Sequence, residues 1–179
     1  MSLIQVHEKV FQLFISREQI QRRVTEIGKK LEQDYEGLNP LFLSVLNGSF
    51  VFAADLFRSL NIEAEISFIK LASYKGTTSS GNVVTAIGLE ESLSGRHVIL
   101  LEDIIDTGRT LHSFIPELLQ RYPASLKIAS FLSKPDALKF PVVPDYLGFE
   151  IPNKFVLGYG LDYDGLGRNL PDLYELVQN

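Results

Sequence analysis

The chain has 179 residues, of which 45% are hydrophobic and 22% are charged, so it can bury one full core and is too apolar for global disorder. It contains no cysteine, which excludes disulfides and thiolate metal sites and is compatible with a reducing, cytoplasmic location. The net charge of −5 disfavours a general nucleic-acid surface, and no run of about 18 apolar residues exists to span a membrane, so we expect neither of these partners.

The first predicted element is a long amphipathic helix over residues 16–36. Ser16 is suited to cap its N-terminus, because a serine side chain can accept a hydrogen bond from the first turn. Apolar residues then recur at three- and four-residue spacing from Ile20 to Leu31, which gives the helix one apolar face. Gly37 is a natural stop, so we expect the helix to end there.

Short apolar runs alternate with helical patterns through the rest of the chain. We expect strands at residues 41–46, 64–69, 83–89, 98–101, 126–132, 146–149 and 154–159, and helices at 50–60 and 107–121. Pro116 should bend or shorten the second of these helices, because proline cannot donate an intrahelical hydrogen bond. Residues 74–82 are a loop rich in Ser, Thr and Gly. Continuously apolar strands that alternate with helices indicate an α/β fold, with a mostly parallel central sheet flanked by helices in one domain over residues 1–179.

The most informative segment covers residues 98–111, with the sequence Val-Ile-Leu-Leu-Glu-Asp-Ile-Ile-Asp-Thr-Gly-Arg-Thr-Leu. It predicts a buried strand, then acidic residues, a small polar loop and the start of a helix. Open α/β sheets bind ligands at the carboxyl ends of their strands. Thr107, Gly108 and Thr110 are small, and the backbone N–H groups at a helix N-terminus attract phosphate. This segment therefore predicts a phosphate site.

Glu102 and Asp103 need a separate explanation, since two carboxylates beside a phosphate repel it. Sugar hydroxyls can donate hydrogen bonds to carboxylates, and Mg²⁺ can bridge carboxylate and phosphate oxygens. The local chemistry thus indicates a sugar phosphate held with magnesium. The simpler alternative, which these residues alone leave open, is a capped helix with acidic residues in its first turn.

The same segment resembles the ribose-5-phosphate and pyrophosphate signature of type I phosphoribosyltransferases, in which two acids follow four apolar residues and precede Asp-Thr-Gly-x-Thr. The chain is most similar to the hypoxanthine-guanine phosphoribosyltransferases, whose motifs occur here in the family's order. The further motifs are Leu46-Asn47-Gly48-Ser49, Ser73-Tyr74, Thr77-Thr78-Ser79-Ser80-Gly81, Ser133-Lys134-Pro135, Gly148–Tyr163 and Arg168. The resemblance implies the type I phosphoribosyltransferase fold, with a small hood and a mobile catalytic loop over residues 73–82.

The reaction that the resemblance implies is a Mg²⁺-dependent step of purine salvage. N9 of hypoxanthine or guanine displaces pyrophosphate from 5-phosphoribosyl-1-pyrophosphate (PRPP) and gives IMP or GMP. Asp106 is implied as the catalytic carboxylate beside purine N7, which accepts a proton or stabilises the protonated edge of the imidazole ring. Glu102 and Asp103 are implied to hold the ribose hydroxyls and one Mg²⁺, and Asp162 to anchor a second Mg²⁺ on the pyrophosphate.

The other implied site residues contact the substrates or close over them. They are Asn47, Gly48 and Arg168 on the pyrophosphate, Thr107, Gly108, Arg109 and Thr110 on the 5′-phosphate, and Lys134, Phe155, Val156, Ile104 and Leu161 around the purine. Lys134 is implied to donate to the 6-oxo group, which selects hypoxanthine and guanine over adenine, and Phe155 to stack on the ring. Ser73 and Tyr74 are implied catalytic residues on the loop that closes and excludes water. In this family the peptide bond that enters the position of Asn47 can be cis.

Two positions depart from the family pattern, since Asn47 and Arg109 stand where some members carry lysine. Three alternatives stay open: a nucleotide-sensing regulatory protein on the same fold, a xanthine-preferring transferase and a uracil-preferring one. The segment around Phe155 favours a purine over a pyrimidine. The implied partners are PRPP and a 6-oxopurine, and the family expectation is a homodimer or a homotetramer.

Overall fold

The computed structural model describes residues 3–73 and 84–177, and the predicted loop at 74–82 lies outside them. The larger of two sheets has the strand order β5 (Val84–Ile87), β4 (Glu65–Ser73), β3 (Leu41–Leu46), β6 (His97–Ile105), β7 (Ser125–Ser133) and β8 (Tyr146–Glu150). Five of these strands run parallel, and β5 pairs antiparallel with β4. The prediction of a mostly parallel central sheet is therefore confirmed.

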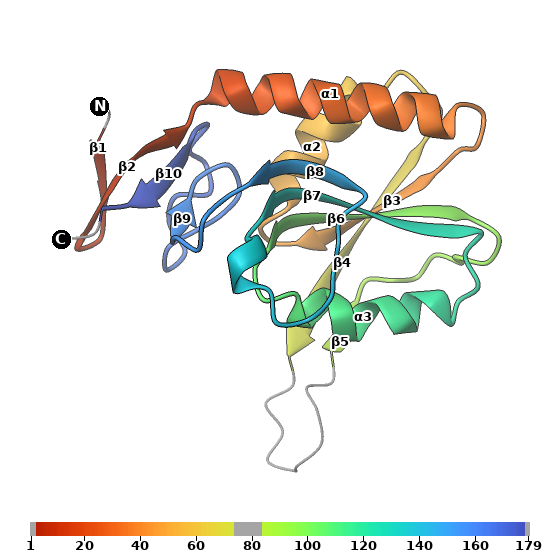
Figure 1. Ribbon diagram of the computed structural model, residues 1–179. Helices are drawn as coiled ribbons and strands as arrows, with labels where there is room; N and C mark the ends of the chain where they lie inside the picture. The colour runs from red at the N-terminus through yellow and green to blue at the C-terminus, as the bar shows by residue number, and fades with distance from the viewer. Residues whose placement is uncertain (1–2, 74–83, 178–179) are drawn as a thin grey trace, which may run out of the picture.

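Helices cover both faces of this sheet (Figure 1). They are α1 (Arg17–Tyr35), α2 (Phe50–Ser59) and α3 (Arg109–Leu119). Successive strand residues point to opposite faces, so Phe42 and Leu101 pack in the core with α1 and α2, whereas Leu43 and Leu100 pack in the core with α3. Because both faces are covered, the central strands are apolar throughout, which is the pattern that predicted them.

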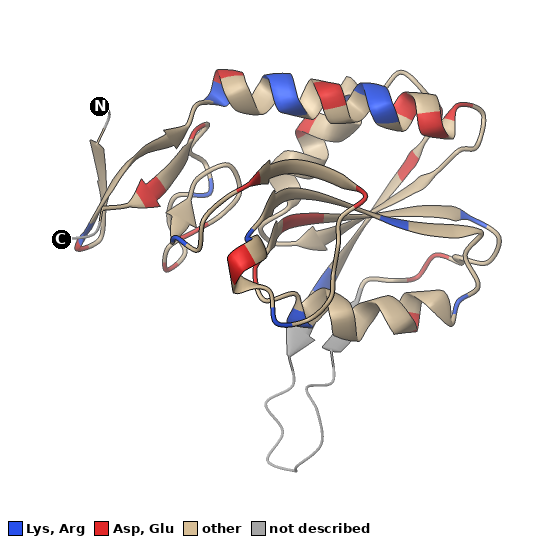
Figure 2. Cartoon of the chain, in the orientation of Figure 1, with Lys and Arg blue, Asp and Glu red and all other residues tan. Residues whose placement is uncertain are grey.

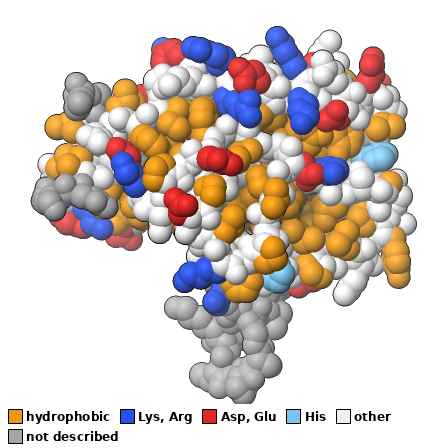
Figure 3. Space-filling model, viewed as in Figure 1, with side chains coloured by type: hydrophobic (Ala, Val, Ile, Leu, Met, Phe, Trp, Pro, Cys, Tyr) orange, Lys and Arg blue, Asp and Glu red, His pale blue; other side chains and the backbone are white. Residues whose placement is uncertain are grey.

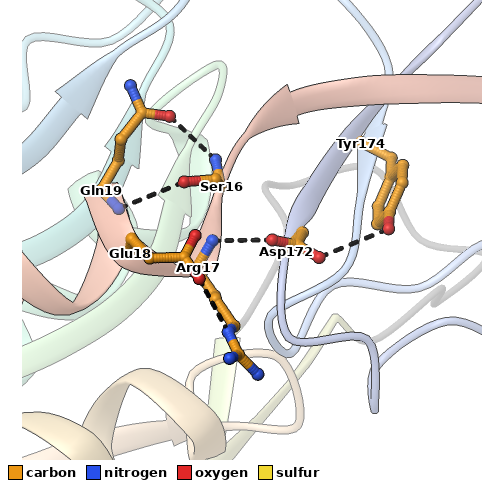
Figure 4. A network of polar contacts seen from close by, with 6 residues as sticks. All are labelled: Ser16, Arg17, Glu18, Gln19, Asp172 and Tyr174. Atoms are coloured by element: carbon orange, nitrogen blue, oxygen red, sulfur yellow. Dashed lines mark hydrogen bonds and ion pairs between the residues drawn. The ribbon is translucent and has the colours of Figure 1, made fainter. Parts of the chain in front are cut away.

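The start of α1 is fixed by its own side chains and by the far end of the chain. The Gln19 amide donates to Ser16 Oγ at 3.4 Å and the Ser16 amide donates to Gln19 Oε1 at 2.9 Å, so the predicted cap is confirmed (Figure 4). The Arg17 amide donates to Asp172 Oδ1 at 2.7 Å. A carboxylate at this position is favourable because it faces the positive end of the helix dipole.

The smaller sheet, called the hood below, joins the two ends of the described chain. Its order is β1 (Leu3–Val6), β2 (Lys9–Ile15), β10 (Leu173–Leu176) and β9 (Val156–Leu157), and every pair is antiparallel. The sequence predicts no strand at β1, β2 or β10, and the strand that it predicts at 154–159 is longer than β9. In β2 only Phe11 and Ile15 are fully buried while Val10 and Leu13 are exposed, so apolar residues lie on both faces and the alternation is obscured.

The boundaries of β6 and α3 also differ from the prediction. β6 continues to Ile105, so the two acidic residues lie within the strand rather than after it. α3 begins at Arg109 rather than at residue 107, because Gly108 adopts a left-handed conformation with φ of 76° and forms the N-cap. The helix then includes Pro116 and continues to Leu119, so it ends two residues before the predicted boundary.

Charged residues are distributed without a basic face on the visible side. Acidic and basic residues alternate along α1 (Figure 2), and charged side chains are frequent over that helix at the top of the space-filling view, with others of both signs spread over the rest of this side (Figure 3). Within the described ranges, the chain contains no helix with the length and apolarity that crossing a membrane requires.

Candidate active site

The candidate site residues gather where β3, β6 and β7 end. These strands are parallel neighbours in the sheet, so their carboxyl ends lie on one edge. The loop after β3 carries Asn47 and Gly48, the end of β6 carries Glu102 and Asp103, and β7 is followed by Lys134. The topology of the sheet therefore brings together three motifs that are far apart in the sequence.

The loop after β3 lies against one of the acidic residues. The Leu46–Asn47 peptide is cis, and Ser49 Oγ donates a hydrogen bond to the Val45 carbonyl at 2.5 Å. Gly48 is buried and has no room for a side chain, because a Cβ there would stand 1.5 Å from Asp103 Oδ2. Only glycine allows the backbone to approach the Asp103 carboxylate this closely.

Glu102 and Asp103 form a partly buried pair of carboxyl groups with few hydrogen-bond partners in the described protein. Glu102 Oε2 is buried and has no hydrogen-bond partner among the described residues, while Asp103 Oδ1 accepts the Ile104 amide at 2.8 Å. Burial, together with the neighbouring Asp103 charge, raises the pKa of Glu102 well above its usual range. Burial also raises the pKa of Asp103. The pair is therefore suited to a ligand that brings hydroxyl donors or a cation.

The segment after β9 supplies the opposing charge. Arg168 Nη2 lies 2.6 Å from Asp162 Oδ1, and Arg168 Nη1 donates to the Gly160 carbonyl at 2.7 Å. The Gly165 amide donates to Asp162 Oδ2 at 2.8 Å. Gly160 packs against the Gly48 carbonyl and Gly48 packs against Asp103, so this segment lies near the carboxyl pair. The Arg168 charge there lowers the pKa of Asp103 against the larger effect of burial. In the part of the chain that the structure describes, no three His, Asp or Glu side chains converge as metal ligands.

The loop between β6 and α3 encloses a cavity of about 120 Å³, lined by Glu102 and residues 104–111. The Thr107 carbonyl accepts the Lys139 and Phe140 amides at 3.0 and 3.1 Å, which fixes the loop. The N-cap of α3 is a glycine without a capping side chain, and the Arg109 amide donates to Thr107 Oγ1 at 3.4 Å, so the next amides of the first turn depend on solvent or a ligand for partners. This is the environment in which helix N-termini bind phosphate.

The acidic residues do not serve as helix caps. The first turn of α3 contains no acidic residue, and Asp106 stands two positions before the N-cap, so the capped-helix alternative is wrong. Asp106 is instead paired with Lys134, whose Nζ lies 3.2 Å from Asp106 Oδ2. The Lys134 side chain is only 9% exposed, whereas that of Asp106 is 49% exposed, so a largely buried cation neutralises an accessible carboxylate.

The predicted purine-stacking residue belongs to the hood. The Phe155 ring lies 6.2 Å from that of Phe11 and 5.6 Å from that of Tyr163, and Phe155 is 43% exposed. Val156 and Leu161 are buried. An exposed aromatic ring supported by other aromatic rings can stack on a planar ligand.

Some predicted residues are beyond what the structure describes, and some residues that pack beside the candidate site were not predicted. Tyr74 lies outside the described residues, as does the side chain of Ser73. The sequence analysis did not single out Asp55, Tyr159 or Gly160, although a Cβ on Gly160 would stand 2.1 Å from the Gly48 carbonyl oxygen. The only indication of these residues in the sequence was the pair of glycines that flank the tyrosine at 158–160.

Known proteins share the chain's sequence and fold over most of its length. Residues 16–164 match the family model of the phosphoribosyl transferase domain. The hypoxanthine-guanine phosphoribosyltransferase of Lactococcus lactis is 43% identical over 89% of this chain and 87% of its own length. The hypoxanthine-guanine-xanthine phosphoribosyltransferase of Tritrichomonas foetus is 40% identical over 87% of this chain and 86% of its own. A crystal structure of a hypoxanthine-guanine phosphoribosyltransferase from Bacillus anthracis has a TM-score of 0.86 and 38% identity, covering 93% of this chain and 98% of that one.

Proposed function

The chain belongs to the phosphoribosyltransferase family, and we propose that it transfers the phosphoribosyl group of PRPP to N9 of hypoxanthine or guanine. The reaction releases pyrophosphate and gives IMP or GMP, so the enzyme acts in purine salvage. The observation that carries the proposal is the ion pair of Lys134 with Asp106 at the same sheet edge as Glu102 and Asp103. This arrangement combines a donor for a 6-oxo group, an acceptor for a purine proton and acceptors for sugar hydroxyls.

The 5′-phosphate of PRPP occupies the cavity between β6 and α3 in this proposal. Thr107, Gly108, Arg109 and Thr110 bind it, because their backbone lies at the uncapped start of a helix. The ribose hydroxyls donate to Glu102 and Asp103. Such donors satisfy the buried Glu102 oxygen, and hydrogen bonds to a charged acceptor are about twice as strong as those between neutral groups.

The carboxyl pair also fits Mg²⁺, because this ion takes hard oxygen ligands and its charge would favour the ionised form of Glu102, whose pKa is raised in the free protein. Glu102 and Asp103 would hold one ion and Asp162 a second. When bound, Mg²⁺ neutralises the charge on the pyrophosphate leaving group. Since no three protein ligands converge in the described ranges, oxygens of the substrate and water would complete each coordination shell.

Purine recognition depends on an exchange of partners by Lys134. On entry of a 6-oxopurine, the Lys134 ammonium leaves Asp106 and donates to purine O6. The freed Asp106 carboxylate then accepts the proton of purine N7 while the N9 electron pair forms the bond to ribose C1′ and pyrophosphate leaves with the C1′–O electron pair. Adenine carries a donor at position 6, so it leaves Lys134 without a partner, at a cost of about 1–3 kcal/mol.

The remaining proposed contacts surround the base and the leaving group. The purine is stacked by Phe155 and bordered by Ile104, the Val156 backbone and Leu161. Backbone amides at Asn47 and Gly48 and the guanidinium of Arg168 bind the pyrophosphate, because a guanidinium fork matches phosphate oxygens. The loop at 73–82, with Ser73 and Tyr74, closes over the bound substrates and excludes water. We further propose a single domain over residues 1–179, a cytoplasmic location, and a homodimer or homotetramer.

The decisive experiment measures pyrophosphate release from PRPP and Mg²⁺ with hypoxanthine, guanine, xanthine, adenine and uracil in parallel. Turnover with the 6-oxopurines and none with adenine or uracil is the expected result, and the relative rates rank hypoxanthine, guanine and xanthine. A preference for xanthine would correct the substrate. No turnover with any base, alongside measurable nucleotide binding, would overturn the proposal in favour of a nucleotide sensor.

The role of Asp106 has its own test. Asp106→Asn preserves the size of the side chain and a hydrogen-bond acceptor but cannot take up a proton. We expect a fall in kcat with hypoxanthine of about 100-fold or more, because general acid–base catalysis contributes typically 10²–10⁴-fold. Near-normal turnover in this variant would show that Asp106 does not act as the base.

A further inference from the structure

A buried tyrosine next to the site is hydrogen-bonded to the helix that follows the pyrophosphate loop. Tyr159 is only 2% exposed, and its hydroxyl donates to Asp55 Oδ2 at 2.8 Å. Burial, followed by the contact with Asp55, raises the pKa of Tyr159 above its usual value, so the hydroxyl keeps its proton and acts as the donor. The Tyr159 ring also packs on the Phe131 ring, with centroids 4.7 Å apart.

Asp55 is rigidly connected to the loop that carries Gly48. It lies on α2, whose first residue, Phe50, is two positions after Gly48. The Ala53 amide donates to the Ser49 carbonyl at 2.8 Å, and Ser49 is in turn bonded to β3. A shift of Asp55 relative to Gly48 would therefore require the first turns of α2 to break.

Tyr159 is connected just as directly to the charged side of the site. Its neighbour, Gly160, lies against the Gly48 carbonyl, where a Cβ would stand at 2.1 Å. The Gly160 amide donates to the Arg168 carbonyl at 3.0 Å, and the Gly160 carbonyl accepts from the Arg168 guanidinium at 2.7 Å. The same guanidinium contacts Asp162. Tyr159 is therefore followed directly by three interacting residues, Gly160, Asp162 and Arg168, which are called the Gly160 unit below.

We propose that Tyr159 and Asp55 are positioning residues that fasten the unit of Gly160, Asp162 and Arg168 onto the Gly48 loop, and that their hydrogen bond sets the affinity for the pyrophosphate half of PRPP. This inference rests on the proposed function, because it assigns Gly48 and Arg168 to pyrophosphate. Neither Tyr159 nor Asp55 needs to touch a substrate. The purine half of the site depends mainly on Lys134, Asp106 and Phe155, which lie outside this unit, so the affinity for the purine should be nearly insensitive to the bond.

Gln21 provides a matched control, because it donates to the same oxygen. Gln21 Nε2 lies 2.6 Å from Asp55 Oδ2, and Gln21 is an exposed residue of α1 that makes no hydrogen bond to the described residues of the Gly160 unit. Tyr159→Phe and Gln21→Met each remove one donor from Asp55 and leave the other. Only Tyr159→Phe removes the hydrogen bond that holds the Gly160 unit. A difference between the two variants therefore reports the positioning of that unit and not simply the loss of one donor to Asp55.

The test measures KM for PRPP, KM for hypoxanthine and the affinity for Mg²⁺-pyrophosphate by calorimetry. We expect Tyr159→Phe to raise KM for PRPP and to weaken pyrophosphate binding about tenfold, which corresponds to about 1.4 kcal/mol. KM for hypoxanthine should stay within about twofold, and Gln21→Met should change none of the three values. Asp55→Ala should reproduce Tyr159→Phe, whereas Asp55→Asn retains a carbonyl acceptor and should keep most of the wild-type affinity.

Three results would overturn the inference. They are unchanged pyrophosphate affinity in both folded Tyr159→Phe and Asp55→Ala, a parallel rise of both KM values, or an equal effect of Gln21→Met. If Tyr159→Phe fails to fold, Asp55→Ala carries the test alone. Pyrophosphate binding is measured without turnover. An inactive wild-type protein would therefore refute the proposed function, whereas the comparison of pyrophosphate affinities among the variants would still decide whether Tyr159 and Asp55 have a positioning role.

Discussion

Replacing Glu102 by glutamine should stabilise the free protein while it removes transferase activity. Glu102 Oε2 is buried without a partner among the described residues, and the Asp103 carboxyl group adds negative charge beside it. A buried polar group left without a partner costs about 1–3 kcal/mol. In a chain of 179 residues each kcal/mol shifts Tm by about 2–4 °C. Glu102→Gln should therefore melt roughly 2–12 °C above the wild type, since its amide nitrogen can donate to Asp103.

The assay is thermal unfolding at neutral pH, first with a chelator and then with Mg²⁺ and PRPP. Ligands that bind only the native state stabilise it by RT ln(1 + [L]/Kd), so the wild type should gain more from Mg²⁺ and PRPP than Glu102→Gln does. Glu117→Gln, on an exposed position of α3, is the control and should leave Tm unchanged. A ligand-free Glu102→Gln protein that melts at or below the wild-type temperature would show that the unpartnered carboxyl group does not destabilise the free site.

Three further predictions concern separate parts of the molecule. Gly48→Ala places a Cβ 1.5 Å from Asp103 Oδ2 and should raise KM for PRPP about tenfold or more, while KM for hypoxanthine stays unchanged. A KM for PRPP equal to that of the wild type would mean that the loop moves to accommodate the added methyl group. Lys134→Met should lower kcat/KM for hypoxanthine by about 10- to 100-fold and reduce the ratio of kcat/KM for hypoxanthine to kcat/KM for adenine. An unchanged ratio would exclude Lys134 as the residue that distinguishes the group at position 6 of the purine. Glu175 is paired with Lys154 at 2.7 Å, and although burial opposes its ionisation, hydrogen bonds from Lys154 and Gln12 lower its pKa. Glu175→Gln should therefore cost about 1–2 kcal/mol at neutral pH. The difference in Tm between this variant and the wild type should disappear at acidic pH. A carboxyl group whose pKa is lowered in the folded state contributes stability above its unfolded-state pKa, and this contribution is lost as the pH falls through the folded-state pKa. A difference in Tm that does not depend on pH would contradict the prediction.

The strands of the central sheet could be predicted because each has a hydrophobic pattern that is visible in its own short segment of sequence. Strands buried on both faces must be apolar at every position, so runs such as Leu41–Leu46 are visible in a single sequence. The hood could not be predicted in the same way. β2 depends on β10 for its inner neighbour, and no local pattern reveals a partner from the other end of the chain.

The candidate site shows the same division between local and distant information. The loop between β6 and α3 was predictable, because small residues between a strand and a helix form a local motif. The position of Glu102 and Asp103 inside β6 was not, since charged residues are usually depleted from buried strands and the pairing of Glu102 with Ser130 of β7 overrides that preference. The link from Tyr159 to Asp55 spans more than a hundred residues, so only the folded chain reveals it.

The hood also determines the order in which the molecule can be completed during synthesis. β2 is among the first strands to leave the ribosome, but β10, its inner neighbour, is the last described strand to do so. The parallel sheet and its helices can assemble meanwhile, while one edge of β2 keeps its backbone N–H and C=O groups unpaired. Asp172 arrives at the start of α1 only with β10, so the cap on that helix and the closed hood are completed in the same late event. A nascent chain stalled before Leu173 would therefore expose an open strand edge, and such edges are where newly made proteins aggregate or recruit chaperones.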